Sequence, residues 1–232
     1  MEHVADIAYE VVRTNRKTIT FYFRDGYLDV RAPLNCPDEF IVSYIESNKK
    51  YLEAKLLETT GLLSQKKGFE LRYGSLVRFR GKKYPIQARD GYRSGFDGEC
   101  FWMPYGLAPD LIIDTCVKIY RSAAQSLIPS KVNDYARIMG VTPQSVKIGN
   151  ARTAWGSCRN GHLIFAWRLM MASDYALDCV VVHELAHIKH PNHSKWFWAF
   201  VKRFMPDYEL RKEELNKLSR EIGWENWEKK EF

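Results

Sequence analysis

The sequence has no long hydrophobic run, and nothing in its 232 residues approaches the ~20 apolar residues of a membrane-spanning helix. Its start has acids at Glu2 and Asp6 and lacks the basic start and apolar core of a secretory signal peptide. The five cysteines are odd in number, widely spaced and without a CxxC pair, which argues against a cysteine-type structural zinc site. These absences predict a cytoplasmic protein in a reducing compartment, with no membrane partner.

The composition is that of an ordinary globular protein, with 46% hydrophobic and 27% charged residues. A stretch with two prolines and a glycine at 104–109 is the best candidate for a domain boundary. We expect residues 1–105 to form a β-rich N-terminal region with one helix and residues 106–232 to form a second domain. Apolar periodicity predicts strands at 18–23, 27–31, 145–148 and 162–169 and within 69–103. It predicts helices at 38–61, 110–139, 177–189, 195–204 and 207–221, with a kink or break at Pro129. Residues 152–161 are expected to form a turn-rich connection.

Positive charge is concentrated in one segment. Between Lys66 and Arg93 there are nine basic and two acidic residues, and the resulting +7 equals the net charge of the whole chain. A basic β-rich segment can be a nucleic-acid surface. Because no aromatic–basic recognition motif accompanies it, the solvated face of a small sheet is the preferred interpretation, and nucleic acid stays a possible partner.

The most informative motif is His-Glu-Leu-Ala-His at 183–187. On a helix, His183 and His187 are one turn apart on the same face and can bind one metal ion together. Glu184 can then reach a water on that metal and accept its proton without being a ligand. The apolar residues at 179–182 favour a core helix that presents one polar face to a cleft.

A catalytic zinc ion usually has three protein ligands, and two histidines are candidates for the third. Pro191 disfavours helix at residue 190, so the chain should turn there, and Ser194 is a suitable N-cap for the next helix. His193 lies just before that cap, where it can point back at the metal. His190 has the right helical phase but would crowd His187 toward the same ion, so His193 is preferred.

Residues near the motif are candidates for stabilising the oxyanion and for binding the substrate. Arg152, Arg168 and Tyr175 are candidates for stabilising the oxyanion, and the sequence does not choose among them. The segment 162–168 is expected to be an edge strand beside the metal helix, to which an extended peptide could add as another strand. The alternative is a strand internal to the sheet, packed through one apolar face.

Several short segments accompany the histidine motif: WGSC at 155–158, FAWRL at 165–169, VVHELAH at 181–187, PNHS at 191–194, FW at 197–198 and, upstream, VRAP at 30–33 and GKKYP at 81–85. Together they resemble the YgjP-like metallopeptidase family, bacterial relatives of the SprT and WLM zinc proteases. The resemblance implies an α+β, gluzincin-like zincin domain at 106–232, with a small sheet and an active-site helix, and places the third histidine at His193. A metzincin would need Gly where His190 stands and a Met-turn that the sequence lacks.

These observations predict a peptidase that uses Zn²⁺ held by His183, His187 and His193, with Glu184 as general base, acting on unfolded or flexible polypeptides. Two alternatives stay open: a zinc hydrolase of a small amide, and a nucleic-acid-associated protease or module acting on DNA-bound proteins. No feature of the sequence indicates an oligomeric state.

Overall fold

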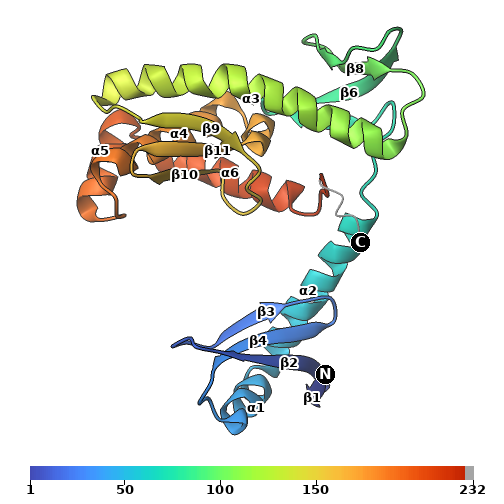
Figure 1. Cartoon of the computed structure of the whole chain (residues 1–232), viewed down its shortest axis with the longest axis vertical. Coiled ribbons are helices and arrows are strands. Elements are labelled where there is room, and N and C mark those ends of the chain that lie inside the picture. The colour runs from blue at the N-terminus through green and yellow to red at the C-terminus, as the bar shows by residue number, and fades with distance from the viewer. Residues whose placement is uncertain (228–232) are drawn as a thin grey trace. The chain divides into compact units, whose positions relative to one another are not determined.

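Six helices and three small β-sheets make up residues 1–227, which are the residues that the computed structural model describes (Figure 1). This confirms the predicted α+β class. The chain divides into two compact units, Met1–Phe69 with Gly223–Asn226, and Glu70–Ile222 with the segment from Trp227. The predicted boundary at 105/106 falls inside the second unit, and residues 228–232 of the predicted peptidase domain lie outside the described part of the chain. No described helix is long and apolar enough to cross a membrane.

The first unit is a four-stranded sheet with two helices. Its strand order is β1-β2-β4-β3, and β2 and β4 pair in parallel while the other neighbours are antiparallel. Leu28 and Val30 of β4 pack in one core with Ile41 and Ile45 of α1. The predicted helix from Asp38 is interrupted at Asn48 and therefore forms two helices. The elements are β1 (Glu2–Val4), β2 (Ile7–Thr14), β3 (Thr20–Phe23), β4 (Tyr27–Pro33), α1 (Asp38–Ser47) and α2 (Lys49–Lys67).

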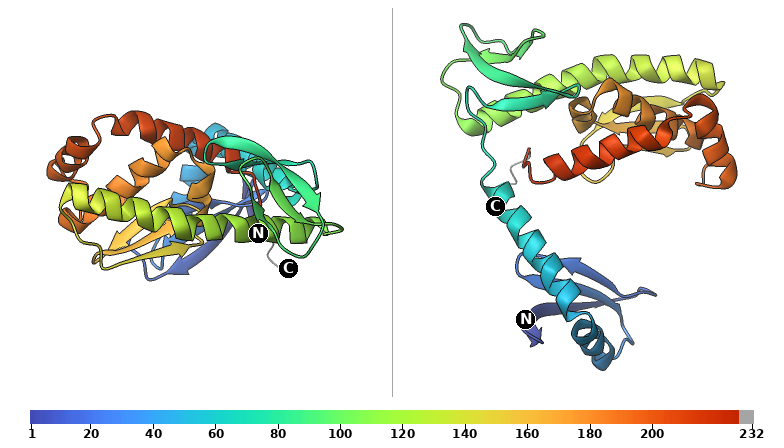
Figure 2. Two further views of the ribbon diagram at one scale, coloured as in Figure 1. Left: turned by 90° about the horizontal axis from the view of Figure 1, so that it is seen from above. Right: turned by 180° about the vertical axis from the view of Figure 1, so that it is seen from behind.

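The second unit begins with another small sheet and one long helix. Its strands are β5 (Leu76–Phe79), β6 (Lys82–Arg89), β7 (Gly95–Phe96) and β8 (Phe101–Pro104), in the order β5-β6-β8-β7. Helix α3 (Pro109–Met139) runs from β8 to β9 (Figures 1 and 2). Of the two outcomes predicted at Pro129, a kink or a break, the break does not occur, because Ile128 and Val132 on either side are fully buried and their packing offsets the lost backbone hydrogen bond.

A three-stranded sheet of β9 (Ser145–Gly149), β10 (Gly156–Arg159) and β11 (His162–Ala166) lies next to the histidine motif. Its order is β10-β11-β9, so β11 is central and paired on both sides. The prediction of an edge strand at 162–168 is therefore wrong, and the strand ends early in a 3₁₀ turn, Trp167–Met171. The reason is β10, which lies within the segment interpreted as turn-rich: Asn160 and Gly161 adopt φ of 50° and 78° and close a two-residue hairpin.

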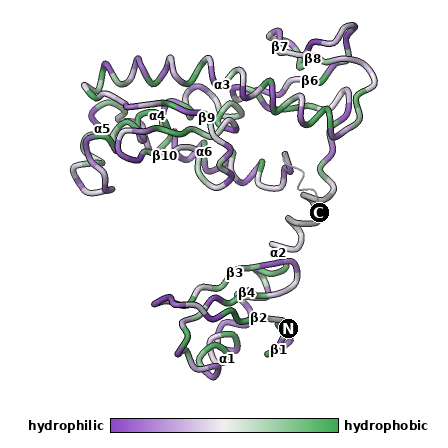
Figure 3. Tube along the Cα trace, viewed as in Figure 1, coloured by the Kyte–Doolittle hydropathy of each residue, from purple (hydrophilic) through white to green (hydrophobic). Residues whose placement is uncertain are grey.

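Three helices complete the second unit: α4 (Asp174–Lys189), α5 (Lys195–Phe204) and α6 (Tyr208–Ile222). Helix α4 combines hydrophobic stretches with polar residues (Figure 3), nine of its residues are buried, and it packs against α3, β10, α5 and α6. Because most of the residues from Ala176 to Ala186 are buried among these elements, the side chain of Glu184 is fixed by packing. The histidine motif lies in the last two turns of this helix.

Candidate active site

The two histidines of the motif are presented by a helix whose limits are set locally. Ser173 caps the start of α4 by accepting a hydrogen bond from the backbone N–H of Ala176 at 3.1 Å. The helix ends at Lys189, as expected for a chain with proline at 191. His183 and His187 are thereby held one turn apart, with ring centroids 4.9 Å from each other.

A tight turn brings a third histidine to the same place. Ser194 caps α5 by accepting from the backbone N–H of Phe197, and His193, just before the cap, points back at α4. The Nε2 atoms of His193 and His183 are 3.1 Å apart, and one ligand atom from each of His183, His187 and His193 lies within 4.8 Å of the others. The ring of His190 packs against Phe200 instead, with centroids 5.4 Å apart.

The protonation of these imidazoles suits metal binding. His187 Nδ1 lies 3.3 Å from the carbonyl oxygen of His190, which can only accept, so Nδ1 carries the proton and the Nε2 lone pair is free. His183 Nδ1 lies 2.9 Å from the hydroxyl of Tyr208. Burial, together with the smaller effect of the neighbouring His187 and His193, lowers the pKa of His183 to about 3. A neutral imidazole is the form that binds a metal.

The donor set therefore fits a metal ion. Two nitrogens bound to one tetrahedral zinc ion at 2.0–2.1 Å would be about 3.3 Å apart, close to the distance between the His183 and His193 nitrogens. Three imidazoles are ligands that zinc and other late transition metals accept. The orienting hydrogen bonds from His183 and His187 are those that metal-binding histidines commonly make.

Glu184 is the charged residue closest in sequence to these ligands, and it is only 6% exposed. Burial raises the pKa of its carboxyl group to about 7. No ion pair joins it to any residue that the structure describes. A buried carboxylate without a cationic partner is expensive to keep charged, so Glu184 is suited to exchanging protons with a bound molecule.

The position of Glu184 depends on a glycine in β10. A Cβ atom placed on Gly156 would lie 2.7 Å from Glu184 Cγ and 2.9 Å from its Oε1, distances that real side chains do not tolerate. It would also lie 3.0 Å from Val180 Cγ1. The glycine of the WGSC segment therefore makes room for the carboxylate, a role that the sequence analysis did not identify.

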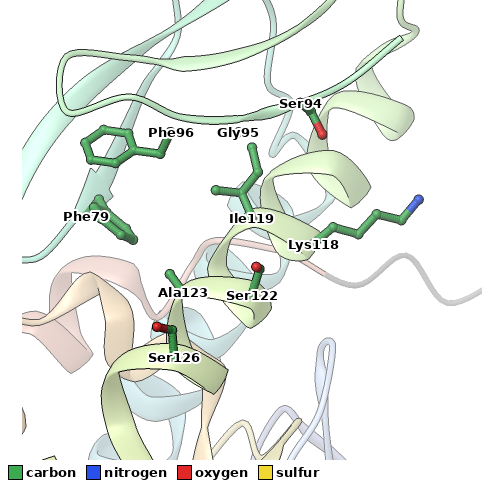
Figure 4. A pocket seen from close by; sticks show the side chains of 9 residues that line it. All are labelled: Phe79, Ser94, Gly95, Phe96, Lys118, Ile119, Ser122, Ala123 and Ser126. Carbon is green, nitrogen blue, oxygen red and sulfur yellow. The ribbon is translucent and has the colours of Figure 1, made fainter. Parts of the chain in front are cut away.

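His183 and Glu184 line a cavity of about 200 Å³. Its other walls come from Cys179 and Val180 of α4, from Trp155 and Gly156 at the start of β10, and from Tyr208, Lys212, Leu215 and Asn216 of α6. A second cavity of about 460 Å³ lies between α3 and the segment 94–96 (Figure 4). The residues that line this second cavity include serines, phenylalanines and Lys118 but no histidine or acid, so the smaller cavity is the one of the two with groups that can bind a metal or exchange a proton.

The three oxyanion candidates do not line the cavity beside Glu184. The hydroxyl of Tyr175 donates to Asp207 at 2.9 Å, and the guanidinium of Arg168 lies over the ring of Trp167. Tyr208, which the sequence did not single out, is the residue whose hydroxyl group lies against His183 Nδ1. The sequence gives little indication of this role, because Tyr208 is one of 13 tyrosines in the chain and simply begins a charged helix.

Four of the nine basic residues of the segment 66–93 are paired with acids in the structure. The ion pairs are Arg72 with Glu70, Arg78 with Glu221, Arg80 with Asp174 and Arg89 with Asp97. The side chains of Lys66 and Lys67 lie outside the described residues. The structure thus favours the solvated face of a small sheet over a nucleic-acid surface.

Comparison with known proteins gives two matches. A model of the YgjP-like metallopeptidase domain matches residues 17–218, which include the three clustered histidines and Glu184. Among solved structures, the crystal structure of the metallopeptidase zymogen of Pyrococcus abyssi abylysin is similar at 20% identity and a TM-score of 0.37, covering 42% of this chain and 96% of that one. No curated protein matches the chain.

Proposed function

The chain belongs to the YgjP-like metallopeptidase family, and from this premise we propose that it hydrolyses peptide bonds with one Zn²⁺ held by His183, His187 and His193. Family membership makes it a metal-dependent peptidase. The observation that carries the choice of ligands is the approach of three imidazole nitrogens to within 4.8 Å of one another, with Glu184 in the lining of the same cavity.

Each residue of the site has a distinct task in this proposal. A zinc ion at the histidines would polarise the peptide carbonyl and make the attacking water more acidic. Glu184 accepts a proton from that water and passes it to the leaving amine. Tyr208 holds the ring of His183 through its Nδ1 atom, and Gly156 leaves the space that the carboxylate of Glu184 occupies.

We further propose that the substrate binds as an extended polypeptide. Strand β10 is an edge strand of its sheet, and its first residue, Gly156, touches Glu184. An edge strand can pair with an added chain through backbone groups, which any sequence offers. Unfolded or flexible polypeptides can adopt that conformation, whereas compact domains cannot present it. The five cysteines are free thiols, which supports the cytoplasm as the proposed compartment.

Metal analysis combined with digestion tests the proposal. The purified protein should contain one zinc ion per chain and should cut a reduced, unfolded protein into peptides. Dipicolinate should remove both metal and activity, and added Zn²⁺ should restore them. A zinc-loaded protein that releases ammonia from small amides but cuts no polypeptide would instead establish the small-amide alternative.

A further inference from the structure

The cavity beside Glu184 has a wall that the chemistry described so far does not use. Helix α6 contributes Lys212 and Leu215, which are three residues apart and so share one face of the helix. Val180 of α4 lies opposite, one turn before His183. With a volume of about 200 Å³, the cavity has room for a single side chain next to the reacting groups.

Lys212 is half-buried on this wall and has no carboxylate within ion-pair distance among the described residues. Its neighbour Arg211 differs, because Arg211 Nε pairs with Asp207 at 3.0 Å. The Lys212 ammonium has aromatic neighbours instead, 5.6 Å from the ring centroid of Trp198 and 5.9 Å from that of Tyr208. It is also close enough to His183 to contribute to the lowered pKa of that ring.

The charges around the cavity leave a place for an anion. Glu184 on α4 is the acid in its lining, Lys212 on α6 is the base, and β10 contributes no charge. Once a divalent ion is bound by three neutral imidazoles, the ion and Lys212 carry positive charge and Glu184 carries one negative charge. Positive charge then exceeds negative charge by two. A half-buried ammonium beside a metal ion is unfavourable unless an anionic group lies between or next to them.

We propose that Lys212 makes this cavity a subsite for an acidic side chain of the polypeptide substrate, at one of the two residues that flank the cleaved bond. Val180 and Leu215 would pack against the methylene groups of a glutamate, and its carboxylate would pair with the Lys212 ammonium. The inference rests on the proposed peptidase function and adds the class of residue that the site selects.

The test uses the zinc-loaded full-length protein and quenched fluorescent peptides that differ only in Glu, Gln or Lys at each flanking position. A charge-assisted hydrogen bond should make kcat/KM about 10- to 100-fold higher with Glu than with Gln at one of the positions. Lys212→Met should make the two peptides equal, and Lys212→Glu should favour the Lys peptide. Lys217→Met, on the same helix but away from this cavity, should keep the parent's preference.

Two outcomes would overturn the inference. Lys212→Met could slow all peptides alike and keep their ratio, in which case Lys212 acts on the reacting carbonyl. The preference could also vanish on amidation of the peptide C-terminus, in which case the terminal carboxylate is the ligand. Calorimetry with reduced-amide analogues of the peptides separates this inference from the peptidase proposal. Tighter binding of the Glu analogue than of the Gln analogue supports the subsite even if no peptide is cut. Absence of cutting counts against the peptidase proposal alone.

Discussion

The two compact units each bury one acidic side chain to nearly the same extent, yet the two carboxylates have opposite surroundings. Asp29, in the first unit, is 5% exposed and Glu184, in the second, is 6% exposed. Arg24 Nη2 lies 3.1 Å from Asp29 Oδ2, and Arg31 Nε lies 2.7 Å from its Oδ1. Hydrogen bonds from Arg31 lower the pKa of Asp29 in spite of burial, whereas burial raises that of Glu184 to about 7.

The difference shows that burial alone does not mark a functional acid. A buried carboxylate with cationic partners stays charged and stabilises the fold, because the partners lower its pKa in the folded protein. A buried carboxylate without such partners holds its proton more tightly and can take one from a bound molecule. We therefore propose a structural role for Asp29 and a chemical role for Glu184, and substitutions at and around the two sites test this contrast.

The largest expected effect is that of Glu184→Gln. The substitution keeps size and hydrogen bonding but removes the proton acceptor, so peptidase activity should fall by about 10²–10⁴-fold. Zinc content and thermal stability should stay at the parent's level, because Glu184 is not a ligand. Undiminished turnover of a polypeptide by the zinc-loaded variant would remove Glu184 from the mechanism.

Gly156→Ala should have the next largest effect. The added methyl group would displace the Glu184 carboxylate, and a shift of about 1 Å at a reacting group can reduce the rate by about 10²-fold. The comparison is Gly61→Ala in α2, where a Cβ meets nothing within 4 Å and activity should not change. The measurement is the steady-state kinetics of both variants with one peptide. Equal activity of Gly156→Ala and Gly61→Ala would refute the positioning role of Gly156.

Tyr208→Phe removes the hydroxyl that contacts His183 and should weaken zinc binding by about 10- to 100-fold. Tyr175→Phe is the matched control, since its hydroxyl contacts Asp207 rather than a histidine. Competition with a coloured chelator measures zinc affinity in both variants. If Tyr175→Phe loses as much affinity as Tyr208→Phe, the hydroxyl at His183 has no specific role.

Asp29→Asn should leave zinc content and catalysis unchanged and reduce the free energy of unfolding by about 1–3 kcal/mol, because charged hydrogen bonds in the first unit are lost. The pKa of Asp29 is lower in the folded than in the unfolded protein, so its contribution is complete above about pH 4 and disappears as the pH falls through the lowered value. Urea unfolding of parent and variant at several pH values should show the stability difference shrinking in acid; a difference that grows in acid contradicts the assignment.

Local sequence signals were sufficient for most of the segment that carries the three histidines. The end of α4 and the start of α5 follow from Pro191 and from the Ser194 cap, and the structure confirms both, whereas α4 begins at Asp174, before the expected residue 177. The same signals put His193 near the other two histidines. Capping and proline act within a few residues, so a single sequence contains them.

The remaining parts of the site depend on packing between distant segments. Tyr208 meets His183 across 25 residues because α6 packs on α4, and no local pattern encodes that contact. Strand β10 was missed although Asn160 and Gly161 form a standard hairpin pair, because the flanking residues lack a clear alternation of apolar and polar side chains. That miss also produced the wrong position of β11 in the sheet.

The most direct test of the central claim, that three clustered histidines hold the metal, is zinc content per chain in His193→Ala beside His190→Ala. The two residues are three positions apart, and only His193 joins His183 and His187 within 4.8 Å. We expect His193→Ala to lose tightly bound zinc and His190→Ala to keep one ion per chain. Retention of zinc by His193→Ala together with its loss from His190→Ala would contradict the account.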